Sequence, residues 1–300
     1  MNLKTSHTFA NLANQIFLQY SCLTPPKLPL ANIDELPESL ALVCKNVTEL
    51  ALERNSISTL SGTLLGTFVS LQELYLRENQ LSSLPDEIGL CANLDSLYLE
   101  DNLLSDLPQG LSKLKKLKGL CLHRNRFSSA PASIFDVASL EELYFDENSI
   151  SEIPEAIKGL VNLKELGIQK NSIGPDLPIG LGKLTSLETF HCEYNNIKEL
   201  PKTFGKLKKL RYLYINNNQF EKVQACIGKC KKVEVRIFPV AKQKEGGWCA
   251  NLQRAPLFAC MRICIYIYDL LLQINCPVVP SSDTSTPTPT PTPPLSDYQR

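Results

Sequence analysis

The sequence predicts an α/β solenoid, a curved right-handed horseshoe. Each turn adds one short strand to a parallel β-sheet on the concave face and a short helical or irregular segment to the convex face. A motif of the form LxxLxLxxNxL supports this fold, because it occurs eight times between residues 47 and 220. Successive copies begin 23 or 24 residues apart. Regular periods of this length are typical of repeat proteins, whose units stack into one continuous core.

The first half of each repeat is predicted to be the strand. In copies such as L71QELYLREN79 and L140EELYFDEN148, apolar and other residues alternate, which is the period of a β-strand, so the leucines share one face. The asparagine after each strand suits a turn, because its side-chain amide satisfies backbone groups that have left the ladder. The predicted structural column consists of Asn55, Asn79, Asn102, Asn125, Asn148, Asn171, Asn195 and Asn218.

The second half of each repeat is predicted to lead the chain back to the next strand. Segments such as L84PDEIGLCANL94 and L200PKTFGKLKKL210 begin with a leucine–proline step, and proline fixes φ where the return starts. With the strand motif, these segments resemble the leucine-rich repeat family. They are most similar to its class of roughly 23 residues per repeat, found in intracellular Ras-group scaffolds and their plant relatives. The resemblance spans residues 47–232, about two-thirds of the chain.

The repeats depart from the motif at a few points. The first repeat has Leu60-Ser61 in place of leucine–proline, and the fourth has Ala130-Pro131. The sixth has an additional residue at Gly174-Pro175-Asp176, where we expect a small bulge. V233EVRIF238 keeps the spacing without the leucines and is expected to be a degenerate terminal strand.

Four parts are expected along the chain. Residues 1–46 form an N-terminal cap of a helix and a half-repeat, and residues 47–240 form the solenoid. Residues 241–280 form an apolar C-terminal cap or a membrane-associating segment. Both readings stay open because Arg262 and Asp269 interrupt the apolar run 256–279. Residues 281–300, rich in proline and threonine, are expected to be a disordered tail.

Composition narrows the class of protein. Lys plus Arg and Asp plus Glu both number 31, so net charge gives no reason to expect a nucleic-acid partner. The 11 cysteines form no CxxC pair, and the N-terminus lacks the apolar core of a signal peptide, which indicates a reducing, cytoplasmic compartment. No phosphate-binding, zinc-protease or hydrolase motif occurs, so we expect no enzyme activity, cofactor or metal. Cys121, predicted on the concave face, is either a reactive thiol or an ordinary one.

A column of tyrosines is predicted to face outward from the sheet. If Leu74 and Leu76 point into the core, the alternation turns Tyr75 to the concave surface. The neighbouring columns contain eleven carboxylates and four basic residues, a formal charge of −7. The residues expected to bind a partner are Tyr75, Tyr98, Tyr144, Tyr214, His191, Glu73, Glu100, Asp146, Glu193, Arg77 and His123.

A negative, tyrosine-lined face favours a partner with a basic or Arg/Lys-bearing surface, because charge complementarity and cation–π contacts both attract one. We therefore expect a non-enzymatic protein–protein interaction scaffold, and the resemblance implies signalling or a small-GTPase-related pathway. An enzyme that uses Cys121 or His191 is one alternative, and three others stay open. The tyrosines merely cover the sheet, or the chain is a bacterial effector acting inside a host cell. The third is a membrane-associated protein anchored by residues 256–279 and by a basic ridge, residues 202–232, with nine Lys or Arg and one acid.

Overall fold

The computed structural model describes residues 33–36, 38–42, 46–221 and 225–236, which belong to one compact unit of the chain. The N-terminal helix expected before residue 23, the apolar segment 256–279 and the tail 281–300 lie outside the described residues. The expected boundaries at residues 46, 240 and 280 therefore stay predictions.

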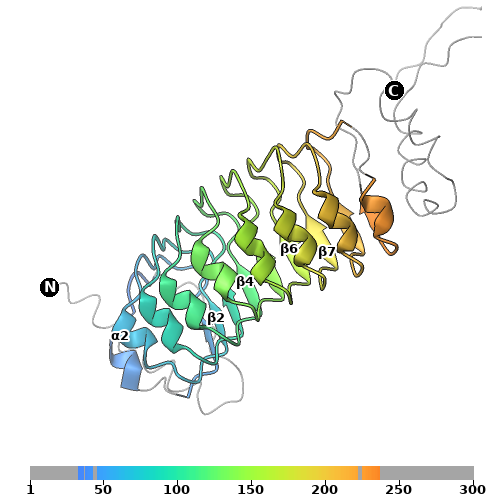
Figure 1. Cartoon of the computed structure of the whole chain (residues 1–300). Coiled ribbons are helices and arrows are strands. Elements are labelled where there is room, and N and C mark those ends of the chain that lie inside the picture. Colours follow the sequence, from blue (N-terminus) through green and yellow to red (C-terminus); the bar gives the residue numbers. More distant parts are fainter. Residues whose placement is uncertain (1–32, 37, 43–45, 222–224, 237–300) are drawn as a thin grey trace, which may run out of the picture. The chain divides into compact units, whose positions relative to one another are not determined.

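Nine short strands pair in chain order into one parallel sheet. They are β1 (Glu49–Ala51), β2 (Glu73–Tyr75), β3 (Ser96–Tyr98), β4 (Gly119–Cys121), β5 (Glu142–Tyr144), β6 (Glu165–Gly167), β7 (Thr189–His191), β8 (Tyr212–Tyr214) and β9 (Glu234–Arg236). Each step has the same register, so that Leu74 lies beside Leu97 and Tyr75 beside Tyr98. Neighbouring strands are thus one repeat apart, which confirms the predicted solenoid (Figure 1).

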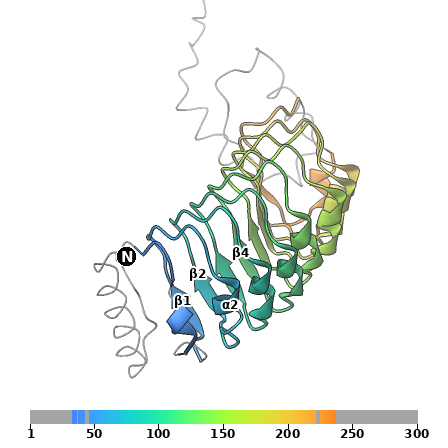
Figure 2. The ribbon, with the colours of Figure 1, turned by 90° about the vertical axis from the view of Figure 1, so that its left-hand side faces the viewer.

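Short helical segments stack along the side of the array opposite the strands (Figures 1 and 2). They are η1 (Glu38–Leu42), α2 (Gly62–Leu65), η2 (Asp86–Leu90), η3 (Gln109–Lys113), η4 (Ala132–Asp136), η5 (Glu155–Gly159), η6 (Ile179–Lys183), η7 (Lys202–Lys206) and η8 (Ile227–Lys229). Those marked η are 3₁₀ helices of three to five residues. A helix this short is enough to turn the chain back toward the sheet within one repeat.

Proline precedes most of the helical segments, but not the segment of the first repeat. Prolines such as Pro85 and Pro108 occupy the N-cap position in extended conformation, where a missing N–H leaves no helical hydrogen bond unmade. The first repeat instead has Ser61, whose hydroxyl oxygen accepts a hydrogen bond from the Leu64 N–H at 3.4 Å. The segment that follows is α2, an α-helix. The departure Leu60-Ser61 therefore changes the cap rather than breaking the repeat.

The apolar positions of the repeats build one continuous core between the sheet and the helical segments. It extends from Ile33 to Cys230, and most of its leucines have no exposed area. Phenylalanines replace leucine at some positions, and Phe127 packs edge-on against Phe145 at a ring distance of 6.1 Å. Cys91, also in the core, is fully buried, and burial raises the pKa of its thiol to about 11. Stacking of repeats thus buries leucines that a single repeat could not.

The asparagine column joins each repeat to its neighbours. Asn102 is typical: its Nδ2 donates to the carbonyls of Leu76 and Leu99 at 2.9 and 3.1 Å. Nδ2 also lies 3.2 Å from the carbonyl oxygen of Glu100, and Oδ1 accepts from the Leu81 N–H at 2.9 Å. These contacts satisfy the backbone where the chain leaves the ladder.

The turn before each asparagine uses a left-handed residue. Eight positions share φ between 52° and 60°: Arg54, Glu78, Asp101, Arg124, Glu147, Lys170, Tyr194 and Asn217. The additional residue of the sixth repeat also uses positive φ, at Gly174 (+151°), where a Cβ would come within 2.3 Å of the Asn196 carbonyl oxygen. The expected bulge is thus a close approach between neighbouring repeats that only glycine permits.

Candidate functional site

The sheet turns one column of side chains away from the core. We call it the tyrosine column: Ala51, Tyr75, Tyr98, Cys121, Tyr144, Gly167, His191 and Tyr214. The four tyrosines and His191 are half-buried, whereas Leu74 and Leu97, one residue earlier in their strands, are buried. The outward orientation expected for Tyr75 from the alternation is the one the strand adopts.

The aromatic rings form two stacked pairs rather than one continuous stack. Tyr75 and Tyr98 lie face to face, with ring centroids 4.6 Å apart and an interplanar angle of 4°. His191 and Tyr214 stack at 4.3 Å and 7°. Parallel strands about 4.8 Å apart allow this geometry wherever two rings are adjacent. Cys121 and Gly167 interrupt the column on either side of Tyr144, as the repeat spacing also indicates.

Neighbouring carboxylates hold the tyrosine hydroxyls. The Tyr75 hydroxyl donates to Glu73 Oε2, and this hydrogen bond, with burial, raises the pKa of Tyr75 far above its usual value. Burial and a hydrogen bond to Glu165 raise the pKa of Tyr144 in the same way. The hydroxyl groups of Tyr75 and Tyr144 are therefore occupied within the sheet, and their ring surfaces remain for contacts with another molecule.

The column two residues after the tyrosine column lies deeper than expected. This following column contains Glu53, Arg77, Glu100, His123, Asp146, Gln169, Glu193 and Asn216. Glu100 is only 7% exposed and Asp146 8%. Burial raises the pKa of Glu100 and raises that of Asp146 to about 6. The alternation of residues in the sequence predicts that Glu100 and Asp146 are both surface charges. Each lies beyond the last strand residue, so strand alternation does not govern it.

Polar atoms without partners gather in the following column. Among the described residues, seven buried side-chain oxygens or nitrogens have no hydrogen-bond partner, and six belong to this column. The six are Glu53 Oε2, Arg77 Nε, Glu100 Oε2, His123 Nδ1, Glu193 Oε2 and Asn216 Oδ1. An unsatisfied buried polar atom costs about 1–3 kcal/mol, so folded chains keep few of them. Their concentration beside exposed aromatic rings marks this part of the sheet as the candidate site.

The next residues along the chain carry charges that neutralise one another. Arg54 pairs with Glu78 at 3.0 Å, and Lys170 pairs with Glu147 at 3.0 Å. Arg124 lies between Asp101 and Glu147 and contacts both. Sequence analysis missed this ladder, although the charges at repeat spacing were a usable signal. The negative excess therefore comes from the columns directly beside the tyrosines.

His191 is enclosed by carboxylates. Its Nε2 lies 3.7 Å from Glu165 Oε1, and its Nδ1 lies 3.7 Å from Glu193 Oε1. Burial alone would lower the pKa of His191, but Glu193, Asp146 and Glu165 together more than offset it, so the pKa is raised. His123 differs, because burial and then Arg124 lower its pKa. The pKa values of the two histidines are thus shifted in opposite directions.

Cys121 does not have the surroundings of a reactive thiol. Burial, with Glu100, Glu142 and Asp146 nearby, raises its pKa to about 12. A thiol with this pKa holds its proton at neutral pH, and the thiolate is the nucleophile. This favours the ordinary-cysteine reading. The described part of the chain contains no group of three or more His, Cys, Asp or Glu side chains placed to hold a metal ion.

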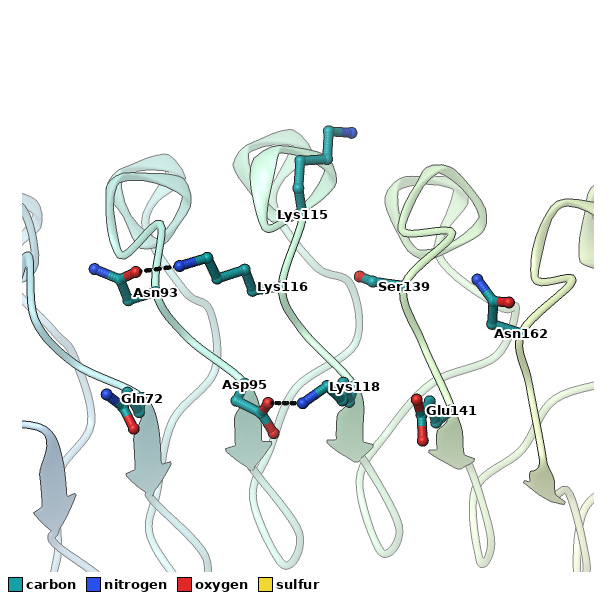
Figure 3. A pocket seen from close by; sticks show the side chains of 9 residues that line it. All are labelled: Gln72, Asn93, Asp95, Lys115, Lys116, Lys118, Ser139, Glu141 and Asn162. Carbon is teal, nitrogen blue, oxygen red and sulfur yellow. Dashed lines mark hydrogen bonds and ion pairs between the residues drawn. The ribbon is translucent and has the colours of Figure 1, made fainter.

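The described surface includes a hollow on the concave face and another on its flank. The concave hollow, about 350 Å³, is lined by Glu49, Ala51, Glu53, Tyr75, Arg77, Tyr98 and Glu100. The flank hollow, about 620 Å³, lies where the chain returns to the strands (Figure 3). It is lined by Gln72, Asn93, Asp95, Lys115, Lys116, Lys118, Ser139, Glu141 and Asn162.

The flank hollow is larger than the concave one, but several of its charged side chains already form ion pairs or hydrogen bonds. Lys118 Nζ contacts Asp95 Oδ2 at 2.5 Å, and Lys116 Nζ donates to Asn93 Oδ1 at 2.7 Å (Figure 3). Glu141 pairs with Lys164 at 2.5 Å. None of the unpartnered buried atoms found among the described residues lines this hollow, whereas three line the concave one. The concave hollow is therefore the better candidate for binding.

The basic ridge, residues 202–232, is a solvated surface where it is described. Its described basic side chains are exposed: Lys202, Lys206, Lys208, Lys209, Arg211, Lys229, Lys231 and Lys232. Lys208 donates to the carbonyls of Gly205 and Lys229, and Arg211 lies 3.9 Å from Glu188. No helix among the described residues has the length and apolar character that a membrane span requires.

A parallel sheet built from eight repeats and a terminal strand, with aromatic and acidic columns on its open face, defines a repeat solenoid of the kind that presents a sheet to a partner. Residues 34–168 and 146–245 match the model of the leucine-rich repeat region. The chain belongs to the leucine-rich repeat family. Proteins of this family generally mediate protein–protein interactions and act as non-enzymatic scaffolds. A search of curated proteins found no match.

Solved structures share the fold. The ectodomain of the Arabidopsis thaliana receptor kinase GASSHO1/SCHENGEN3, in complex with CASPARIAN STRIP INTEGRITY FACTOR 2, is 31% identical with a TM-score of 0.59, over 68% of this chain and 25% of that one. The Arabidopsis receptor kinase HAESA, in complex with the peptide hormone IDA and the co-receptor SERK1, is 27% identical with a TM-score of 0.59, over 68% and 35%. Internalin C2 from Listeria monocytogenes is 20% identical with a TM-score of 0.59, over 66% and 84%. The chain spans only a quarter to about a third of the two plant receptors.

Proposed function

We propose that the chain is a non-enzymatic scaffold that binds a protein partner on its concave sheet face, and that the partner presents a basic or Arg/Lys-bearing surface. The observation that carries this proposal is the row of unpartnered polar atoms beside the half-buried tyrosine column. A partner that supplies donors would satisfy the carboxylates of that row and cover the rings at the same time.

The distribution of charge also supports the concave face as the binding surface. The preceding column holds Glu49, Glu73, Glu142 and Glu165, and the following column holds four carboxylates and Arg77. Because the ion-pair ladder beyond them is neutral, the excess of −7 sits in these two columns. Such a field speeds encounter with a basic partner and weakens as salt is added.

The finer assignments follow from the repeat class. The period of 23 or 24 residues and the leucine–proline step are features of the intracellular Ras-group class, so we place the chain in the cytoplasm, in signalling or a small-GTPase-related pathway. The two plant receptors were solved in complex with peptide or protein partners, so the shared fold is compatible with binding such partners. The partner of this chain is proposed from its own charges rather than from theirs.

Replacing three tyrosines is expected to abolish partner capture. The variant carries Tyr75→Ala, Tyr98→Ala and Tyr144→Ala in the full chain, and it removes exposed ring surface while leaving the leucine core intact. Affinity capture from a lysate, read by quantitative mass spectrometry, should show specific partners reduced at least about tenfold, which corresponds to about 1.4 kcal/mol. The thermal transition should move by only a few degrees.

A matched control removes apolar surface from the helical side of the solenoid. Leu90, Val161 and Ile179 are 52%, 47% and 66% exposed, and their triple alanine variant should retain every specific partner. If the tyrosine variant retains its partners while the control loses them, the concave face is not the interaction surface.

A further inference from the structure

One part of the concave face already shows how a flat nitrogen-containing ring is enclosed there. His191 stacks on Tyr214, the ring of the next repeat, at 4.3 Å. Glu165 and Glu193 contact its two ring nitrogens from opposite sides, each at 3.7 Å. A planar imidazole ring, positively charged when protonated, is thus enclosed by one tyrosine face and two carboxylates, one from the preceding column and one from the following column.

The first repeat has a related arrangement without the imidazole ring. Glu53 corresponds to Glu193, whereas Glu49 corresponds to Thr189, because Glu165 belongs to the strand before His191. At the position equivalent to His191 stands Ala51, which lies beside Tyr75 of the next repeat. Glu49 and Glu53 precede and follow Ala51 by two residues, as members of the same acidic columns. Because alanine has only a methyl group there, one face of Tyr75 opens into the concave hollow of about 350 Å³. The other face is covered by Tyr98.

Three of the residues that line the hollow have an unsatisfied polar atom. Glu100, only 7% exposed, lines the hollow, and its Oε2 has no hydrogen-bond partner among the described residues. Glu53 Oε2 and Arg77 Nε are likewise buried atoms without a hydrogen-bond partner. The terminal torsion of a glutamate is broad, so a small rotation turns these oxygens toward an arriving donor. Three carboxylates against one guanidinium leave the hollow with an excess of two negative charges.

We propose that this hollow is an arginine-binding subsite, in which a guanidinium group of the partner lies over Ala51, stacks on Tyr75 and donates to Glu53 Oε2. The inference rests on the proposed function, since the arginine belongs to the protein bound on the concave face. A guanidinium fits better than an ammonium because it is planar, stacks on aromatic rings and offers donors in a fork. The backbone carbonyl of the same bound segment is the acceptor for Arg77 Nε.

The flank hollow and the His191 cluster do not offer such a site. Lysines and carboxylates of the flank hollow pair with one another, as Lys118 does with Asp95. In the other cluster, the position on Tyr214 is already filled by His191. The first repeat is the place on the described concave face where the tyrosine and the carboxylates are present and the cation is supplied from outside.

The test uses a library of random twelve-residue peptides displayed on phage and selected on the full chain. Selected peptides should share an arginine. A synthetic copy is then measured by fluorescence polarisation, in which citrulline, a neutral isostere, replaces that arginine. We expect binding to weaken at least about thirtyfold with citrulline and about tenfold for the Glu53→Gln chain. Ala51→Arg should block the subsite with its own side chain.

Glu152→Gln is the matched control, because it removes the same charge from an exposed residue outside the hollow, and it should bind the peptide as the original chain does. Equal binding of lysine and arginine peptides, or enrichment of no arginine at all, overturns the inference. If the selected peptides lack arginine but lose binding on the triple tyrosine variant, the proposed function stands and the subsite does not. Peptides insensitive to every concave substitution contradict both.

Discussion

Replacing Asn102 by alanine is expected to lower the free energy of unfolding by about 3–4 kcal/mol, because it removes several buried hydrogen bonds together. The side chain is 5% exposed and serves three carbonyls and the Leu81 N–H. Alanine leaves these backbone groups without partners in a place that water does not reach. Urea unfolding of the full chain, followed by circular dichroism, measures the change.

Asn162→Ala is the control for this prediction. The Asn162 side chain is exposed and donates a single hydrogen bond, to the Ala138 carbonyl at 2.9 Å, so its removal should cost about 1 kcal/mol or less. Comparable losses from both substitutions would show that the asparagine column does not hold the turns together. The slopes of the transitions must agree, because repeat arrays can lose cooperativity.

Asp146→Asn is expected to stabilise the chain by about 1–3 kcal/mol at pH 7.5 and to have little effect near pH 3.5. Burial, with Glu193 nearby, raises the pKa of Asp146 from 3.8 to about 6, against the opposing effects of its Gln169 hydrogen bond and His191. The folded chain therefore binds more protons than the unfolded chain between these two values. Stability contributed by this group falls as pH rises through that window.

Asparagine avoids the buried charge and can still accept the hydrogen bond that Asp146 Oδ1 receives from the Gln169 N–H at 3.0 Å. Thermal unfolding of both chains over pH 3.5 to 8 measures the difference. A benefit that is independent of pH, or a loss of stability at pH 7.5, would contradict the assignment of a raised pKa to Asp146. Glu152→Asn, at an exposed position, controls for the general loss of a negative charge.

Much of the fold is predictable from the sequence because the repeat imposes it. A period of 23 or 24 residues fixes which residues become neighbours, so Tyr75 and Tyr98 could be placed side by side before any coordinates. The role of each asparagine likewise follows from its place after a strand. The helical segment of the first repeat, α2, was less predictable, since Ser61 stands in place of proline and the segment is an α-helix.

The depth of the charged residues could not be predicted in the same way. Alternation describes side chains only within a strand, and each strand ends at the tyrosine column, so the burial of Glu100 and Asp146 depends on the turn that follows. The left-handed turn residues were missed for the same reason. The ion pairs between them were missed as well, although the opposite charges of Arg124 and Asp101 lie at repeat spacing in the sequence. The two stacked aromatic pairs depend on ring orientation, which a residue pattern does not contain.

Site-specific photocrosslinking tests the central claim most directly, because it reports which face of the chain touches the partner. Benzoylphenylalanine is placed at Tyr144, on the concave face, and separately at Ile179, which is 66% exposed on the helical side. Both chains are irradiated in the same lysate, and adducts are identified by mass spectrometry. Binding on the concave sheet predicts partner adducts from position 144 and none from position 179. Adducts from position 179 alone would contradict it.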